Sequence, residues 1–331
     1  MRALCVVLIA LLLGGCAVPI VPAYPTASPS PEPITTLRSA LPATLLPTDS
    51  PAPAPTATLA RLGPRQISGN LLNQITRLED DMPRASSQGF VVPTDAEKIA
   101  FAEIVANLEA DRNDQAIQQA AENGYELVQY SDRTDADAIS LLLREVRPIH
   151  KGWGLYAFRP GPARDVIVEA PHPLFDEGTP VIAAQIYQAL PGRALLIAGA
   201  HRHANADGSA DAAHQDQTIF EAVHESLTKS DQTVIVQVHG FASSKHAGYP
   251  SVVLSTDGAR ATELVERLAE ALRQAGVSVG VCDGGSWAAL CGETNVQAQH
   301  IGPATFIHME LDESVRTNPT ALVAALRQVL P

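Results

Sequence analysis

The sequence has little positive charge. Against 36 acidic residues it carries only 23 lysines and arginines, which gives a formal net charge of -13. A surface that binds nucleic acid needs a basic face, because the phosphate backbone is negatively charged. The charge balance therefore argues against nucleic acid as a partner, and it gives no positive indication of a substrate.

Long hydrophobic runs are also scarce. The apolar run over residues 3–13 is shorter than the roughly 20 residues that a spanning helix needs. It follows the basic Arg2 and precedes small residues, the pattern of a secretory signal. The segment Leu13–Cys16 resembles the lipobox of bacterial lipoproteins, which implies that Cys16 is lipidated and that the exported chain is anchored to the extracytoplasmic side of a membrane. The alternative is an ordinary secretory signal in which Cys16 is incidental.

Cysteine is rare, with four residues in the chain. Cys5 leaves with the signal and Cys16 would carry lipid, so Cys282 and Cys291 remain, close together around a glycine-rich turn. In an oxidising compartment such a pair predicts a local disulfide. Two zinc ligands are the less favoured alternative, because thiolate sites usually use tighter Cys-x-x-Cys spacing.

Residues 17–65 have almost no aromatic or periodic apolar residues and are dominated by Pro, Ala, Thr and Ser. Such a segment cannot bury enough surface to offset its ordering entropy, so we expect a disordered linker that acts as a stalk. The remainder divides into a mainly helical region, 66–150, and a second domain, 151–331.

Two patterns separate these regions. The first is expected to contain helices at 67–82, 94–124 and 135–145 and a strand at 125–130. The second is expected to alternate strands at 155–158, 166–170, 194–198, 234–238 and 305–309 with helices at 181–190, 217–227, 259–275 and 319–330. That alternation indicates an α/β domain with a mixed or parallel sheet and helices on its faces. In such sheets functional groups gather beyond the carboxyl ends of the strands.

Nine of the ten histidines lie after residue 170. His172, the pair His201 and His203, and His239 each follow an apolar strand. One histidine in such a place would more often be a hydrogen-bonded structural residue. Repeated placement at strand ends favours a metal site.

The segment after the strand at 166–170 supplies two candidate ligands, His172 and Glu177. Zinc accepts imidazole and carboxylate, and a catalytic site uses three protein ligands plus a water. His239, followed by a glycine that permits a sharp turn, is the best candidate for the third. Asp176 could replace Glu177 or hold an imidazole N–H. Alternatively, both carboxylates cap the following helix.

A zinc hydrolase also needs a base and substrate-binding groups. Glu310 lies in an apolar run, where burial would raise its proton affinity, although it could instead be a strand-end carboxylate paired with a cation. Arg202 and Asn205 are candidates for substrate binding, since arginine holds a carboxylate through two parallel hydrogen bonds. A surface salt bridge is an equally good interpretation of Arg202.

Together these motifs resemble the zinc carboxypeptidase-like superfamily over roughly residues 150–331. The similarity is to its compact branch, which includes N-formylglutamate amidohydrolases and a phage poly-gamma-glutamate hydrolase. The spacing His172-x-x-x-x-Glu177 is similar to that of the phage enzyme, and His239, Arg202 and Glu310 match the third ligand, the carboxylate-binding arginine and the catalytic glutamate. The resemblance implies a three-layer α/β/α fold with a mixed, mostly parallel sheet, one Zn²⁺, and hydrolysis of amide bonds in peptide, gamma-glutamyl or N-acyl amino acid substrates.

Two other functions compete with this one. A lipoprotein that binds metal or a small ligand without turnover would suit the histidine-rich loop 201–214, but it would not need Glu310 beside the metal. A serine hydrolase using Ser243 or Ser286 is disfavoured, because the loop at 240–244 lacks the Gly-x-Ser-x-Gly elbow.

Overall fold

The computed structural model describes residues 63–135, 138–256 and 261–331, and every structural statement below concerns these residues. The predicted signal, the predicted lipidation site Cys16 and nearly all of the predicted linker lie outside them. Among the described helices, none is long and apolar enough to cross a membrane.

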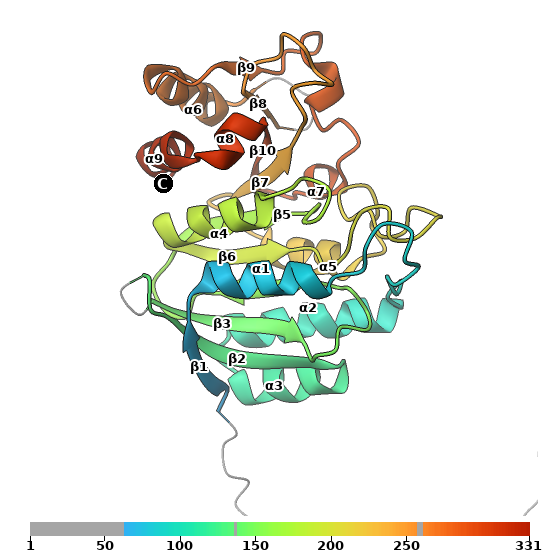
Figure 1. Cartoon of the computed structure of the whole chain (residues 1–331). Helices are drawn as coiled ribbons and strands as arrows, with labels where there is room; N and C mark the ends of the chain where they lie inside the picture. Colours follow the sequence, from blue (N-terminus) through green and yellow to red (C-terminus); the bar gives the residue numbers. More distant parts are fainter. Residues whose placement is uncertain (1–62, 136–137, 257–260) are drawn as a thin grey trace, which may run out of the picture. The chain divides into compact units, whose positions relative to one another are not determined.

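The described residues form one ten-stranded mixed sheet in the order β1-β2-β3-β4-β6-β5-β7-β10-β8-β9 (Figure 1). The strands are β1 Arg65–Gly69, β2 Tyr125–Asp132, β3 Ala138–Glu145, β4 Leu155–Phe158, β5 Arg164–Ala170, β6 Gly192–Ile197, β7 Val234–Gly240, β8 Val252–Ser255, β9 Val279–Val281 and β10 Thr305–Leu311. The central strands β6, β5, β7 and β10 are parallel to one another. Their carboxyl ends therefore meet at one edge of the sheet.

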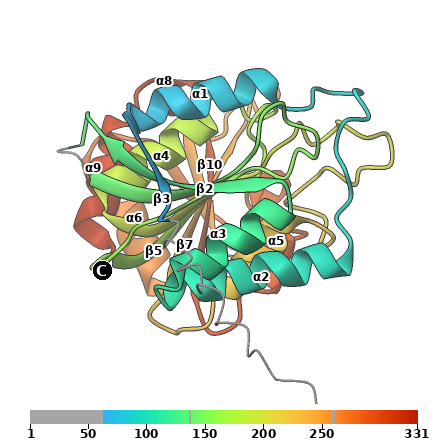
Figure 2. The same cartoon turned by 90° about the horizontal axis from the view of Figure 1, so that it is seen from below.

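Helices cover both faces of the sheet (Figure 2). One face carries α1 Leu71–Asp81, α4 Thr179–Ala189, α6 Glu263–Gln274 and α9 Thr320–Val329, and the other carries α2 Asp95–Glu109, α3 Asn113–Glu122 and α5 Ile219–Leu227. Two short helices, α7 Val296–Gln299 and α8 Glu313–Thr317, and a 3-10 turn at Ala288–Leu290 lie in connections. Each face has its own apolar core. The three-layer α/β/α expectation is confirmed.

The prediction of a helix at 135–145 is wrong, because Ala138–Glu145 is strand β3. Leu142 packs into one core, whereas Leu141 and Leu143 pack into the other. A strand buried on both faces is a continuous apolar run that periodicity cannot distinguish from a buried helix, and leucine favours the helical interpretation. The region 66–150 thus supplies β1, β2 and β3 to the same sheet as the rest of the chain.

The helical pattern over 94–124 is two helices rather than one. Thr94 begins α2 with a reciprocal capping box to Glu97, as the sequence signal predicts. The chain then breaks at Asp111, whose φ of 55° is left-handed, before α3 begins at Asn113. The expected linker ends slightly too late, since β1 already starts at Arg65.

Candidate metal centre

Alternation along the central strands places polar side chains on one face near their carboxyl ends. In β7, Val236 and Val238 pack into the core beneath α4, so Gln237 and His239 point to the opposite face. His239 is the register partner of Glu310 in β10. His172 follows β5, the other neighbour of β7, by two residues. The three strand ends therefore bring predicted residues from distant parts of the chain together.

Hydrogen bonds fix which ring nitrogen of His239 faces the site. The Glu169 carboxylate can only accept when ionised, so the Gln237 amide N–H₂ must point to it, at 2.9 Å. The Gln237 carbonyl oxygen then accepts from His239 Nε2 at 2.8 Å. Burial lowers the pKa of His239, which keeps the ring neutral. A neutral ring that is protonated at Nε2 presents an unprotonated Nδ1, and this atom lies 3.2 Å from Asp176 Oδ2.

His172 is arranged in the same way. Its Nε2 lies 2.8 Å from Asp211 Oδ1 and its Nδ1 lies 3.3 Å from Asp176 Oδ2. Burial opposes protonation of the ring, but the hydrogen bonds to the two aspartates outweigh it and raise the pKa of His172. A metal ion would displace that proton, because zinc binds neutral imidazole. Asp211 would then hold the Nε2 proton and orient the ligand.

Asp176 stands between the two imidazoles, and its side chain is 4% exposed. Burial alone would raise its pKa, but the two adjacent imidazoles, His172 first, hold that pKa well below the ordinary range. One donor atom from each of the three residues therefore lies within 4.8 Å of the others, and both Nδ1 atoms approach the same carboxylate oxygen. Neutral rings would direct two nitrogen lone pairs at an anionic oxygen, an arrangement that a divalent cation stabilises. This donor set fits zinc.

The structure replaces Glu177 with Asp176 in the candidate ligand set. The backbone N–H groups of Phe175 and Asp176 both donate to the His172 carbonyl, at 3.2 and 2.9 Å. This helix-like turn puts residue i+4 on the same side as His172. Glu177, one position later, has an exposed side chain and belongs to no metal-binding group among the described residues.

Glu310 lies beside the cluster without hydrogen-bonding to it. Its Oε2 atom is buried and has no hydrogen-bond partner among the described residues. Burial, assisted by the negative charge of Asp176, raises the pKa of Glu310 well above the ordinary carboxyl range. Glu310 is half-buried, and a buried carboxyl oxygen without a partner is costly in a merely structural position. Here it lies within reach of His239 and His308, with which it forms a second potential donor group.

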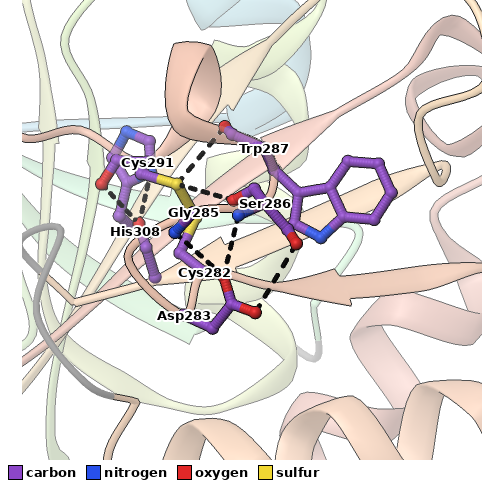
Figure 3. Close-up of a disulfide and its surroundings, with 8 residues drawn as sticks. Cys282, Asp283, Gly285, Ser286, Trp287, Cys291 and His308 are labelled. Carbon is purple, nitrogen blue, oxygen red and sulfur yellow. Dashed lines mark hydrogen bonds between the residues drawn. A yellow bond between two sulfur atoms is a disulfide. The ribbon is translucent and has the colours of Figure 1, made fainter.

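His308 joins this site to the disulfide loop (Figure 3). The predicted disulfide between Cys282 and Cys291 is confirmed. The Ser255 hydroxyl donates to the Cys291 carbonyl at 2.8 Å, so it accepts from His308 Nδ1 at 3.2 Å. Burial lowers the pKa of His308 well below its usual value. The ring is therefore neutral, with Nε2 available as an acceptor.

The structure gives Arg202 and Asn205 other partners. Arg202 forms a two-pronged ion pair with Asp211, with Nε at 3.0 Å, and its guanidinium lies over the exposed ring of Phe175. It remains close to the cluster, with Nη1 3.5 Å from His172 Nδ1. Asn205 instead hydrogen-bonds to the backbone of Phe90 and to Ser209, which ties its loop to the segment before α2. Its contacts are structural.

Sequence reasoning missed three residues that complete the arrangement, Asp211, Gln237 and His308, and it named His214 only as part of the histidine-rich loop 201–214. Asp211 and His214 form a further potential donor group with His172, while Gln237 and His308 support or flank His239. The sequence contains a signal for Gln237 and His308. Each is a polar residue in an apolar strand, two positions before a predicted site residue. His201 and His203 belong to none of the metal-binding groups among the described residues.

No protein-family model and no curated protein matches this chain. Among solved structures, a bacteriophage poly-gamma-glutamate hydrolase is 14% identical with a TM-score of 0.38, over 52% of this chain and 84% of that one. An N-formylglutamate amidohydrolase from Ralstonia eutropha JMP134 is 13% identical with a TM-score of 0.38, over 53% and 96%. The LapA aminopeptidase of Legionella pneumophila is 14% identical with a TM-score of 0.34, over 79% and 70%. Similarities this distant carry no argument about activity, which must come from the site.

Proposed function

We propose that the protein is a zinc-dependent hydrolase of amide bonds. The observation that carries this proposal is the convergence of His172 Nδ1, His239 Nδ1 and Asp176 Oδ2, beside the unpaired carboxyl group of Glu310. The three converging groups would hold one Zn²⁺ and leave a further coordination position for water. A pure metal-binding protein would have no use for Glu310, because a buried carboxyl oxygen without a partner costs stability.

The metal ion and the side chains around it have separate roles in the proposed reaction. Bound Zn²⁺ supplies Lewis acidity, which polarises a carbonyl and makes water a better nucleophile at neutral pH. Asp211 and Gln237 hold the Nε2 protons of the two imidazoles and so keep both Nδ1 atoms aimed at one point. Glu310 Oε2 takes the proton of the attacking water and returns it to the leaving amine. The positive charge of the ion favours the carboxylate form that this step requires.

The substrate class follows from charge near the centre. Arg202 is the cation at the cluster, with Nη1 3.5 Å from His172 Nδ1. Arg202 is partly exposed and shares its guanidinium with Asp211. We assign it to a substrate carboxylate, as in peptides, gamma-glutamyl chains or N-acyl amino acids. The exposed ring of Phe175, on which Arg202 lies, forms the adjoining surface.

We further propose that the chain works outside the cytoplasm, held to a membrane by lipid on Cys16. Support comes from the charged and apolar start of the sequence and from the local disulfide between Cys282 and Cys291. Metabolic labelling with a radioactive fatty acid tests this proposal. Wild-type chain should incorporate the label and Cys16→Ala should not. Equal incorporation by both would contradict lipidation at this residue.

The hydrolase proposal is tested by metal content and turnover in the full-length chain, purified in detergent. Glu310→Gln should retain the zinc of the wild type and lose hydrolysis by at least about 100-fold, the usual contribution of a general base. His172→Ala should bind one zinc fewer than the wild type and lose activity. A panel of N-acyl amino acids and gamma-glutamyl peptides supplies the substrates. Wild-type turnover by Glu310→Gln would refute the assigned role, and an unchanged zinc content in His172→Ala would refute the centre.

A metal-binding protein without turnover is the second candidate. The observation that favours it is the additional donor group of His172, Asp211 and His214 beside the proposed centre. In that case the wild type and Glu310→Gln would bind zinc equally, and neither would hydrolyse any member of the panel.

A further inference from the structure

A separate group of metal-binding side chains lies near α5, away from the centre described above. Glu221 and Glu225 are four residues apart on α5, so they share one face of the helix. His300 ends α7 and joins them, with Nδ1 2.7 Å from Glu221 Oε1 and 3.5 Å from Glu225 Oε1. One donor atom from each residue lies within 4.8 Å of the others.

The group lines an open hollow of about 480 Å³ between α2 and α5. Four carboxylates and two lysines line this hollow together with His300: Asp95, Asp216, Glu221, Glu225, Lys98 and Lys229. Lys98 is already paired with Asp95, at 3.2 Å. The hollow is therefore negatively charged on balance and gives an ion access to all three donors.

Glu221 is the residue that most needs a cation. Its side chain is 3% exposed, and among the described residues it has no ion pair with a lysine or arginine. Burial raises its pKa even though His224 and His300 oppose the shift. A desolvated carboxylate of this kind is stabilised by a nearby positive charge. Imidazole and carboxylate together are the donors that zinc and similar divalent transition metals accept.

Buried hydrogen bonds connect this group to the first centre. Gln297 Nε2 donates to Glu221 Oε2 at 2.6 Å, and Gln297 Oε1 accepts from Gln237 Nε2 at 3.2 Å. Gln237 in turn accepts from His239 Nε2, as described above. The two glutamines are fully buried, so few alternative partners are open to them. An ion that fixes Glu221 would also restrain the amide that orients His239.

We propose that Glu221, Glu225 and His300 form a second divalent-metal site that communicates with the first centre through Gln297 and Gln237. The ion lies between the Glu221 carboxylate and the His300 imidazole, and water from the hollow fills its remaining coordination positions. Binding of this ion tightens metal binding at the first centre. The second site stands independently of the proposed hydrolase activity, whereas the communication rests on the first centre being a metal site.

The test measures zinc bound per full-length chain at buffered free zinc, by mass spectrometry after equilibrium dialysis. Glu225→Gln combined with His300→Asn removes two donors whose side chains are 51% and 39% exposed, so the fold is retained. His150→Ala, an exposed histidine outside all the donor groups among the described residues, is the matched control. The double variant should bind one zinc fewer than the wild type and the control. Equal zinc content in all three would overturn the second site.

His172→Ala separates this proposal from the first. If it binds one zinc fewer and its combination with the double variant binds two fewer, both sites stand. If His172→Ala retains every zinc while the double variant loses one, the hydrolase proposal fails and the second site stands. Communication is read from the affinity of the first centre, which should fall at least about fivefold in the double variant. An unchanged affinity would overturn the communication.

Discussion

The adjacent residues Asp176 and Glu177 give a matched test of the metal centre. Asp176→Asn and Glu177→Gln each remove one negative charge and keep nearly the same shape. The Asp176 carboxylate is buried between two imidazoles, at 3.3 Å from His172 and 3.2 Å from His239. The Glu177 side chain is exposed. Because Asp176 and not Glu177 belongs to the donor group, the two substitutions should have very different effects.

The magnitudes follow from burial. Removing one partner of a buried charge pair costs roughly 3–5 kcal/mol, so metal-free Asp176→Asn should lose about 3 kcal/mol of unfolding free energy. An exposed substitution such as Glu177→Gln should stay within about 0.5 kcal/mol of wild type. Zinc affinity should fall more than about 100-fold in Asp176→Asn, because even residues that only support a ligand contribute 10–100-fold. Glu177→Gln should bind zinc with wild-type affinity.

Two assays on the full-length chain check these values. Urea unfolding of chelator-treated protein, followed by circular dichroism, gives the metal-free stabilities. Competition with a fluorescent chelator gives the zinc affinities. The reasoning is refuted if Glu177→Gln loses zinc while Asp176→Asn retains it. That result would mean that the turn after β5 rearranges on metal binding and brings the residue five positions after His172 to the ion.

Two further predictions concern a supporting residue and the pH dependence of stability. Gln237→Leu removes the acceptor for His239 Nε2, so it should weaken zinc binding 10- to 100-fold. The same chelator competition measures this affinity. An unchanged affinity would show that the Nε2 proton needs no partner. Burial raises the pKa of Glu79 from 4.5 to about 7, with Arg84 opposing the shift, so the folded chain loses stability as pH rises through this window. Glu79→Gln should therefore raise the free energy of unfolding by about 1 kcal/mol above pH 7, after allowance for solvent screening of this partly exposed group, and the gain should vanish near pH 4.5. A gain of equal size at both ends of the window, in urea titrations, would contradict the shifted pKa.

The apolar strands of the second half could be located from the sequence because their physics is local. Runs such as Val234–Val238 are too short and too β-branched for a helix and too apolar for an exposed strand. Since adjacent parallel strands end at one edge, the expectation that His172, His239 and Glu310 lie together needed only the fold class. In the structure His239 shares one donor group with His172 and another with Glu310. The error at 138–145 has the opposite cause, because burial on both faces removes the periodicity that separates strand from helix.

The choice between Asp176 and Glu177 could not be made in the same way. It depends on whether the backbone after β5 closes a helix-like turn on the His172 carbonyl, and the composition of the segment permits either geometry. Asp211 was equally inaccessible, because it reaches His172 from a loop 39 positions away. Such partners are fixed by tertiary structure, whereas strand ends are fixed by local hydrophobicity and topology.

The polar row in the middle of the sheet is a different case, because its signal is present in the sequence. Glu169 on β5 and His308 on β10 are both register partners of Gln237 on β7, which lies between them. All three are buried, and a buried polar group costs roughly 1–3 kcal/mol unless it is paired. Three such residues in one row must therefore hydrogen-bond to one another or serve a nearby functional site. Here Gln237 binds Glu169 and positions His239, while His308 flanks His239 directly. A polar residue two positions before a strand-end ligand thus indicates the groups that orient it, and this inference needs only the two-residue period of a strand.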